Sequence, residues 1–168
     1  DDAPSPIQSR ALISVTVDNA PQLDALFDDT VKWQGYTITL SNTIDMSGYP
    51  QTSAIGDINR PFTSTFDGNG HTITNLTVTI SSAGLVDAGM FGELGSGHVI
   101  KNLTLAGTIS GASTGGAVSS GGIAGSASGG EIRNVIFQGE VAGSTEDIRM
   151  STRVGGLVGD ARDDTITQ

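Results

Sequence analysis

One phrase recurs along this chain, and the recurrence constrains the fold more than any other feature. It reads GHTITNLTV at 70–78, GHVIKNLTL at 97–105 and, more loosely, GGEIRNVIF at 129–137. A second phrase, two residues between glycines, recurs every 33 or 34 residues at 89–92, 122–125 and 156–159. Self-similarity at a period of about 20 to 50 residues is typical of a solenoid, in which each repeat buries its apolar face only against its neighbours.

The repeats are of the β type. Each unit combines glycine pairs or Gly-Ser clusters with short runs rich in Val, Ile, Leu and Thr, and no apolar spacing of 3.6 residues occurs within them. This pattern excludes helical hairpins. We therefore predict an all-β fold, a right-handed parallel β-helix, with its repeats over residues 36–168 and the chain ending within a repeat.

Aligning the phrases predicts two stacked columns, one of isoleucines and one of asparagines. The isoleucines are Ile73, Ile100 and Ile132, and the asparagines are Asn75, Asn102 and Asn134. Asn tolerates left-handed backbone angles, so an Asn at a corner lets both flanking strands point their apolar residues inward. Stacked at ~4.8 Å, the amides could form a hydrogen-bonded ladder. A row that binds a ligand is the alternative.

The glycines of the second phrase are expected to be structural. They are Gly89, Gly92, Gly122, Gly125, Gly156 and Gly159. Glycines around two apolar residues let the backbone bend tightly while the middle pair enters the core. A phosphate-binding loop would need a following helix and a Lys or a distal acid, and the sequence offers neither.

One amphipathic helix precedes the repeats, within residues 19–35. Its apolar stripe consists of Leu23, Leu26, Phe27 and Val31. A helix with a polar back fits over an open solenoid end, which otherwise exposes strand edges and core side chains. Residues 1–18 are predicted to be an extension with one strand, RALISVTV, whose partner the sequence does not identify.

Composition narrows the chemistry and the partners. The net charge of −10 repels phosphate backbones, so no nucleic-acid partner is expected. The chain has no Cys, which excludes disulfides and thiolate metal sites. No apolar run approaches the ~20 residues of a membrane span. The beginning, DDAPSPIQSR, fits a secreted protein after signal removal or a trimmed chain.

With these features in order, residues 19–168 resemble the bacterial surface and secreted proteins that carry the GLUG motif. The resemblance rests on TLSNTIDMSGY, IGDINRPFTSTFDGNGHTITNLTV, AGMFGELGSGHVIKNLTLAG and VGGLVG, in that order. Met90, Ile123 and Ala124 depart from the family pattern. The resemblance implies parallel β-helices built into adhesins, surface proteins and non-catalytic stalks of secreted peptidases, and so display or adhesion rather than catalysis.

A few side chains of the sequence have spacings that would suit catalysis or metal binding. Glu93 and Asp160 follow the second phrase in two repeats, two strands or roughly 9.6 Å apart, near the upper limit for an inverting glycosidase. His71 and His98 occupy equivalent phrase positions and could share a metal. DGNG at 67–70 resembles part of a calcium loop but lacks its distal Glu. We expect no catalytic, cofactor-binding or metal-binding residue among them.

The expected function is therefore structural. The sequence favours a non-enzymatic extracellular or cell-surface module of an adhesin or filament, open at its last repeat. Its partners would be further copies, neighbouring repeats of a longer chain, or a host or matrix glycan or protein. The alternative is a carbohydrate-binding or polysaccharide-degrading β-helix, a polysaccharide lyase or glycoside hydrolase.

Overall fold

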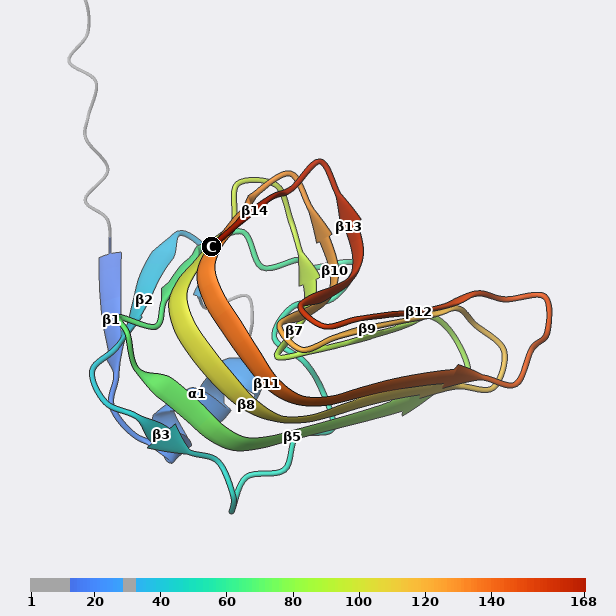
Figure 1. Cartoon of the computed structure of the whole chain (residues 1–168), viewed down its shortest axis with the longest axis horizontal. Coiled ribbons are helices and arrows are strands. Elements are labelled where there is room, and N and C mark those ends of the chain that lie inside the picture. The colour runs from blue at the N-terminus through green and yellow to red at the C-terminus, as the bar shows by residue number, and fades with distance from the viewer. Residues whose placement is uncertain (1–12, 29–32) are drawn as a thin grey trace, which may run out of the picture.

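The chain folds as a parallel β-solenoid. The computed structural model describes residues 13–28 and 33–168 and is 59% strand and 7% helix, with about 4 stacked turns and one short helix. Each strand-to-strand ladder is parallel. Figure 1 shows the coils winding counterclockwise toward the viewer from blue to red, which is right-handed winding. The predicted right-handed parallel β-helix is confirmed.

Three ladders hold the coils together. In chain order the elements are β1 Ile13–Val17, α1 Ala20–Asp28, β2 Tyr36–Leu40, β3 Ile44–Asp45, β4 Thr65–Asp67, β5 Thr72–Ser82, β6 Val86–Ala88, β7 Phe91–Leu94, β8 Val99–Ser113, β9 Val118–Gly121, β10 Ala124–Ser128, β11 Glu131–Thr145, β12 Thr152–Gly155, β13 Val158–Arg162 and β14 Thr165–Thr167. The main sheet runs β1-β2-β4-β8-β11-β14, with β3 and β5 attached. The other two are β12-β9-β6 and β13-β10-β7.

We number the coils by their strand in the main sheet: β2 opens coil 1, β4 coil 2, β8 coil 3, β11 coil 4 and β14 coil 5. Coils 2 to 4 run out along β5, β8 or β11, back along β6, β9 or β12, and then along β7, β10 or β13 (Figure 1). The outward strands and the returning strands form two thin layers that project together from the rest of the solenoid. We call these two layers the arm. The remainder is the body.

A column of apolar side chains runs through the body along the main sheet. Its members pair in register and are Val15, Ile38, Phe66, Ile100, Ile132 and Ile166. The inner four are fully buried, whereas Ile166 in coil 5 is 43% exposed. Each buried residue therefore has an apolar neighbour both above and below it, which is how a solenoid makes a core from short strands.

The predicted isoleucine column was wrong for Ile73. Ile73 pairs with Ile44 and Leu105, while Phe66 takes the place beside Ile100. The cause is a longer corner in coil 2. In coil 2, residues 68–71 lie between Asp67 and Thr72. In coil 3, only residues 102–103 lie between the partners of those two residues, Lys101 and Thr104. The similar phrase therefore falls one corner further along in coil 2 than in coils 3 and 4.

The same displacement removes Asn75 from the predicted ladder. Asn75, Asn102 and Asn134 all have left-handed backbones, with φ of 56°, 53° and 52°. Asn134 Nδ2 donates to Asn102 Oδ1 at 2.9 Å, and Asn102 Nδ2 donates to Asp67 Oδ1 at 3.1 Å. Asn75 lies at a different corner and donates to Asp45 Oδ1 at 2.9 Å. The amide ladder thus consists of two asparagines and an aspartate.

The glycines of the second phrase stack in register, but glycine is needed there for a reason other than bending of the backbone. Phe91, Ala124 and Val158 pair in register, which aligns the three phrases. None of the six glycines has a positive φ. Instead, backbone atoms approach five of the six closely, Gly156 being the exception: a Cβ on Gly89 would lie 2.6 Å from the Phe91 carbonyl oxygen and 2.8 Å from Ala124 Cα. Glycine is needed at these five positions because there is no room for a side chain, and not because the backbone adopts left-handed angles.

The described part of the predicted N-terminal helix is α1. α1 spans Ala20–Asp28, and the Asn19 side chain accepts a hydrogen bond from Gln22 N at 3.0 Å, as a helix N-cap does. Leu23, Leu26 and Phe27 are buried in the solenoid core. Val31 lies outside the described residues. The strand before the helix, β1, pairs in parallel with β2.

Two matched substitutions test the role of close backbone approach. Gly89→Ala should lose about 1 to 3 kcal/mol of unfolding free energy, because its Cβ would overlap backbone atoms of coils 2 and 3. Gly156→Ala, at the same place in the last phrase, has nothing within 4 Å of its added Cβ and should change stability by less than about 0.5 kcal/mol. Equal losses in chemical denaturation would contradict the packing account.

Candidate functional site

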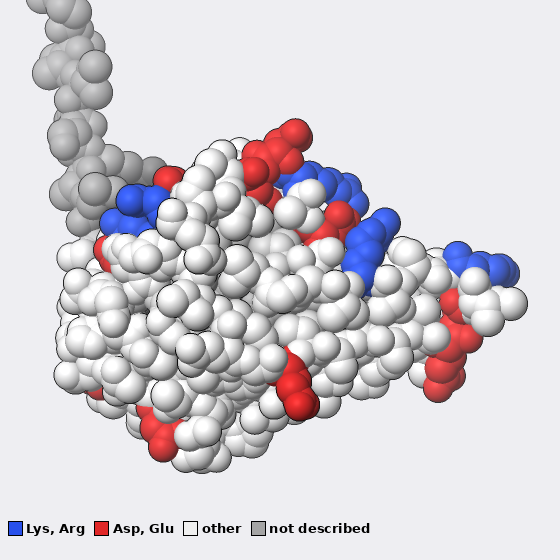
Figure 2. All heavy atoms as spheres, viewed as in Figure 1, with Lys and Arg blue, Asp and Glu red and all other residues white. Residues whose placement is uncertain are grey.

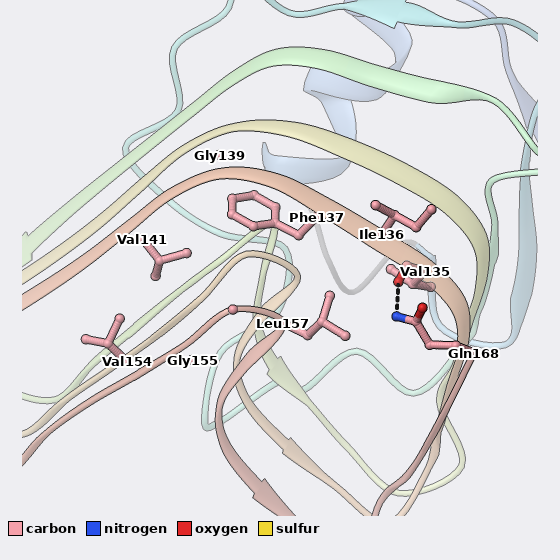
Figure 3. A pocket seen from close by; sticks show the side chains of 10 residues that line it. Val135, Ile136, Phe137, Gly139, Val141, Val154, Gly155, Leu157 and Gln168 are labelled. Atoms are coloured by element: carbon pink, nitrogen blue, oxygen red, sulfur yellow. Dashed lines mark hydrogen bonds between the residues drawn. The ribbon is translucent and has the colours of Figure 1, made fainter.

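A large hollow lies at the C-terminal face of the solenoid. It measures about 650 Å³ and opens over coil 4 (Figure 3). Its lining consists of Val135, Ile136, Phe137, Gly139, Val141, Val154, Gly155, Gly156, Leu157 and Gln168. β11 supplies one wall, and the end of β12 with the following phrase supplies the other. Nearly all of these groups are apolar or glycine, so the face resembles a core cut open between two coils.

Exposure changes sharply at this face. Val154 is 50% exposed and Ile166 is 43% exposed, while Ser120 and Ile132, their partners one coil earlier, are fully buried. Within the described residues, β12, β13 and β14 each pair on one side only, as does β11 beyond Arg133. Figure 3 shows one polar contact here, from Gln168 Nε2 to the Val135 carbonyl oxygen at 3.4 Å. Unpaired strand edges beside exposed apolar groups are able to pair with another strand.

A second, lateral hollow lies in the angle between the arm and the body. It measures about 200 Å³ and is lined by Ile58, Leu85, Asp87, Glu93, Ser119, Ser126, Ser128, Arg153, Asp160 and Arg162. We call it the lateral groove. Two ladders build its walls, because Asp87 pairs with Ser119 and Ser119 with Arg153, while Ser126 pairs with both Glu93 and Asp160. Figure 2 shows acidic and basic side chains gathered where the arm meets the body.

Charge is unevenly balanced along the lateral groove. Asp160 contacts Arg162 at 2.7 Å and Arg153 at 4.0 Å. Burial, together with the nearby charges of Glu93 and Asp160, raises the pKa of Asp87 to about 6. A hydrogen bond with Ser119 and the charge of Arg162 only partly offset this increase. Asp87 is thus a carboxyl group whose charged form the fold disfavours.

The structure brings two of the predicted carboxylates together and adds one that the sequence reasoning missed. Glu93 and Asp160 share a column with Ser126 between them, as the spacing predicted. Asp87 lines the same groove from the opposite wall. Its signal was available in the sequence, since Asp87, Ser119 and Arg153 each precede the glycine phrase by two or three residues. Among the residues that the structure describes, no aromatic side chain lines the lateral groove.

The two histidines do not form a pair. His98 lies at the start of coil 3, next to Ser64 of coil 2, whereas the His71 carbonyl accepts a hydrogen bond from Thr104 N at 3.3 Å. The longer corner of coil 2 separates them, so the predicted one-strand spacing was wrong. Within residues 13–28 and 33–168, no group of three or more His, Asp or Glu side chains is placed to hold a metal ion.

The side chains of Lys101 and Arg133 and the DGNG turn at residues 67–70 make ordinary surface contacts. Lys101 and Arg133 pair in register. Lys101 Nζ lies 3.0 Å from Asp67, and Arg133 Nε lies 3.1 Å from Glu131. Asp67 also accepts a hydrogen bond from Asn69 N at 2.8 Å, which closes the turn. The oxygen atoms of DGNG therefore serve the corner and the ladder.

Comparisons with known proteins give few matches. No protein-family model matches the chain. Halomucin from Haloquadratum walsbyi is 40% identical over 116 residues, which is 68% of this chain and 1% of halomucin. A crystal structure of a protein from Bacteroides ovatus, provisionally named an immunoglobulin A1 protease, aligns over 91% of this chain and 75% of that chain. Its sequence identity is 17% and its TM-score is 0.38.

This chain spans about 1% of the length of halomucin. Among the described residues, no helix is both long enough and apolar enough to cross a membrane.

Removing the charge of Asp87 should stabilise the chain in a pH-dependent way. Because the folded pKa is raised, to about 6, wild-type stability falls as pH rises from about 4 to about 6. Asp87→Asn should therefore gain roughly 1 kcal/mol at pH 7, a value discounted for screening at the open groove, and gain little at pH 4. Asp147→Asn, at a carboxyl paired with Arg149 at 2.8 Å whose pKa the hydrogen bonds from Arg149 lower, is the control and should give no gain. Equal effects of both substitutions in urea denaturation would contradict this electrostatic account.

Proposed function

We propose that this chain is a non-catalytic structural module of a surface or secreted protein, and that its C-terminal face stacks on further β-coils. The observation that carries the proposal is the combination of an apolar hollow with unpaired parallel strand edges at that face. A further coil would continue both the backbone ladders and the apolar columns. The coil would come from neighbouring repeats of a longer chain or from a second copy.

The geometry favours a coil over a small ligand as the occupant. The walls of the hollow are strand segments that already stack in register through coils 2 to 4, for example Gly107 on Gly139 and Ile109 on Val141. A parallel strand placed one spacing further, ~4.8 Å away, would extend the same ladder. The side chains at the hollow offer little to orient a polar small molecule, because Gln168 is the only polar one among the described residues that line it.

Two resemblances support location at or beyond the cell surface. The similarity to halomucin favours a surface or secreted protein. The GLUG-like phrases favour an adhesin-type repeat region, in which display of a neighbouring domain or attachment to a glycan or protein of the surroundings is the role. The acidic net charge of −10 fits a protein that stays in solution while it presents such a surface.

A carbohydrate-binding groove is the second candidate, and the lateral groove is the observation that favours it. Carboxylates and three serines face each other across it, a set able to accept and donate hydrogen bonds to hydroxyl groups. Against catalysis, Asp160 is held by two arginines, and sugar-stacking aromatic rings are missing from the lining. Turnover of a polyuronate that Glu93→Gln abolishes would replace the structural proposal with an enzymatic one.

Self-association of the 168-residue chain tests the stacking proposal. Its mass in solution should rise with concentration, and negative-stain images should show discrete oligomers or filaments. Val154→Asp should weaken association by at least about tenfold, because it places a charge in the contact. Ile148→Asp is the matched control, since Ile148 is 99% exposed at the arm tip and away from the face.

The outcomes separate the two sources of the occupant. A mass that rises with concentration in the wild-type chain and in Ile148→Asp, but not in Val154→Asp, supports stacking of copies. A monomer at all concentrations contradicts that form and leaves neighbouring repeats of a longer chain as the occupant. Association that persists unchanged in Val154→Asp contradicts the choice of face.

A further inference from the structure

A buried pair of polar side chains links coil 3 to coil 5. His98 at the start of coil 3 is 0% exposed, and the side chain of Asp164, just before β14, is 1% exposed. His98 Nε2 lies 3.7 Å from Asp164 Oδ1. Neither His98 Nε2 nor Asp164 Oδ2 has a hydrogen-bond partner among the described residues. Buried polar atoms without partners are costly, so such a pair calls for a physical explanation.

Coil 4 makes this contact possible by having no side chain between the two groups. Gly130 lies between them in the stack, and its N–H donates to Asp164 Oδ1 at 2.8 Å. A Cβ on Gly130 would overlap the ring of His98. The imidazole and the carboxylate therefore meet across a glycine, two coils apart.

The other ring nitrogen determines what His98 Nε2 can do. His98 Nδ1 lies 2.8 Å from the Gly95 carbonyl oxygen, which can only accept a hydrogen bond. Nδ1 therefore carries a hydrogen. In a neutral imidazole Nε2 would then be a bare acceptor, facing a carboxylate that is also an acceptor. Two acceptors at this distance in a buried site repel each other unless one additional proton lies between them.

We propose that the folded chain holds one additional proton on the His98–Asp164 pair, and that this proton latches coil 5 onto coils 3 and 4. With that proton present, Nε2–H faces the Asp164 carboxylate as a charge-assisted pair. Without it, the contact that fixes the residues before β14 becomes repulsive. The latch is independent of the proposed stacking function, since it concerns contacts within one chain.

The neighbouring charged side chains that the structure describes pair with one another or face solvent, and none of them forms an ion pair with His98 or Asp164. On coil 4, the Glu131 side chain pairs with Arg133 at 3.1 Å. On coil 5, the Arg162 side chain pairs with Asp160, and Asp163 is exposed at a left-handed turn. On coil 2, the adjacent residue is the uncharged Ser64, whose carbonyl accepts from Val99 N. Among the described residues, Asp164 is the one carboxylate within 4 Å of the His98 ring nitrogens.

The sign of the pH dependence follows from proton linkage. An unfolded histidine loses its proton at about pH 6.5, so above that pH the folded chain binds one more proton than the unfolded chain. Stability should therefore fall as pH rises above about 7, with the unfolding equilibrium constant increasing up to tenfold per pH unit. Asp87 acts in the same direction but at lower pH, between about 4 and 6, so the two effects occupy different windows.

The test compares substitutions at the two histidines of the chain, with His71 as the control for His98. Urea denaturation of the 168-residue chain is measured from pH 7 to pH 9 for the wild type, His71→Gln, His98→Gln and Asp164→Asn. The wild type and His71→Gln should show the increase in the unfolding constant with pH. His98→Gln should not. Asp164→Asn should not either, because its amide can donate to a neutral Nε2 without an additional proton.

Nitrogen NMR of the wild-type chain gives a second readout that does not depend on any variant folding. With only two histidines, the ring signals are readily assigned by comparison with His71→Gln. At pH 7.5 the buried imidazole should have a hydrogen on both nitrogens, because Nε2 carries the additional proton. A wild-type stability that is flat from pH 7 to pH 9, or a slope that persists in His98→Gln, would overturn the latch.

Discussion

The structure depends on in-register parallel stacking of unequal coils. The strands of each coil make their ladder hydrogen bonds with the coils on either side, and the buried side chains of the main sheet stack on their counterparts in those coils. Ile100, for instance, lies between Phe66 and Ile132. The arrangement makes an interior coil well supported and an outer coil poorly supported, which is why the C-terminal face exposes Val154 and Ile166 while their counterparts are buried.

Small residues let this stacking produce a thin arm and a groove. Inside the arm, a Cβ on Gly111 would lie 2.7 Å from Ser120 Oγ and 3.1 Å from Ala88 Cβ, so the two layers approach too closely for larger side chains. The returning strands then diverge from the body, and the outward-facing residues of two ladders line the lateral groove. The same stacking places Asp87 near Glu93 and Asp160 and thereby raises its pKa.

Sequence reasoning succeeded where the period is regular and failed where one coil differs in length. The glycine phrases keep their register because their spacing is nearly constant, so the Glu93 and Asp160 column was predictable. Ile73 and Asn75 were misplaced because the insertion at residues 68–71 moves a similar phrase to another corner. The His98–Asp164 contact was beyond reach, since it depends on the space above Gly130, across two coils that show no common phrase there.

Hydrogen exchange of the backbone amides at two protein concentrations tests most directly the claim that the C-terminal face accepts another coil. Amides of β12, β13 and β14 and of β11 beyond Arg133 should exchange more slowly at the higher concentration, while those of β8 and β10, already between two coils, should not change. Identical exchange at both concentrations, or new protection confined to β1, would contradict the claim for stacking between copies.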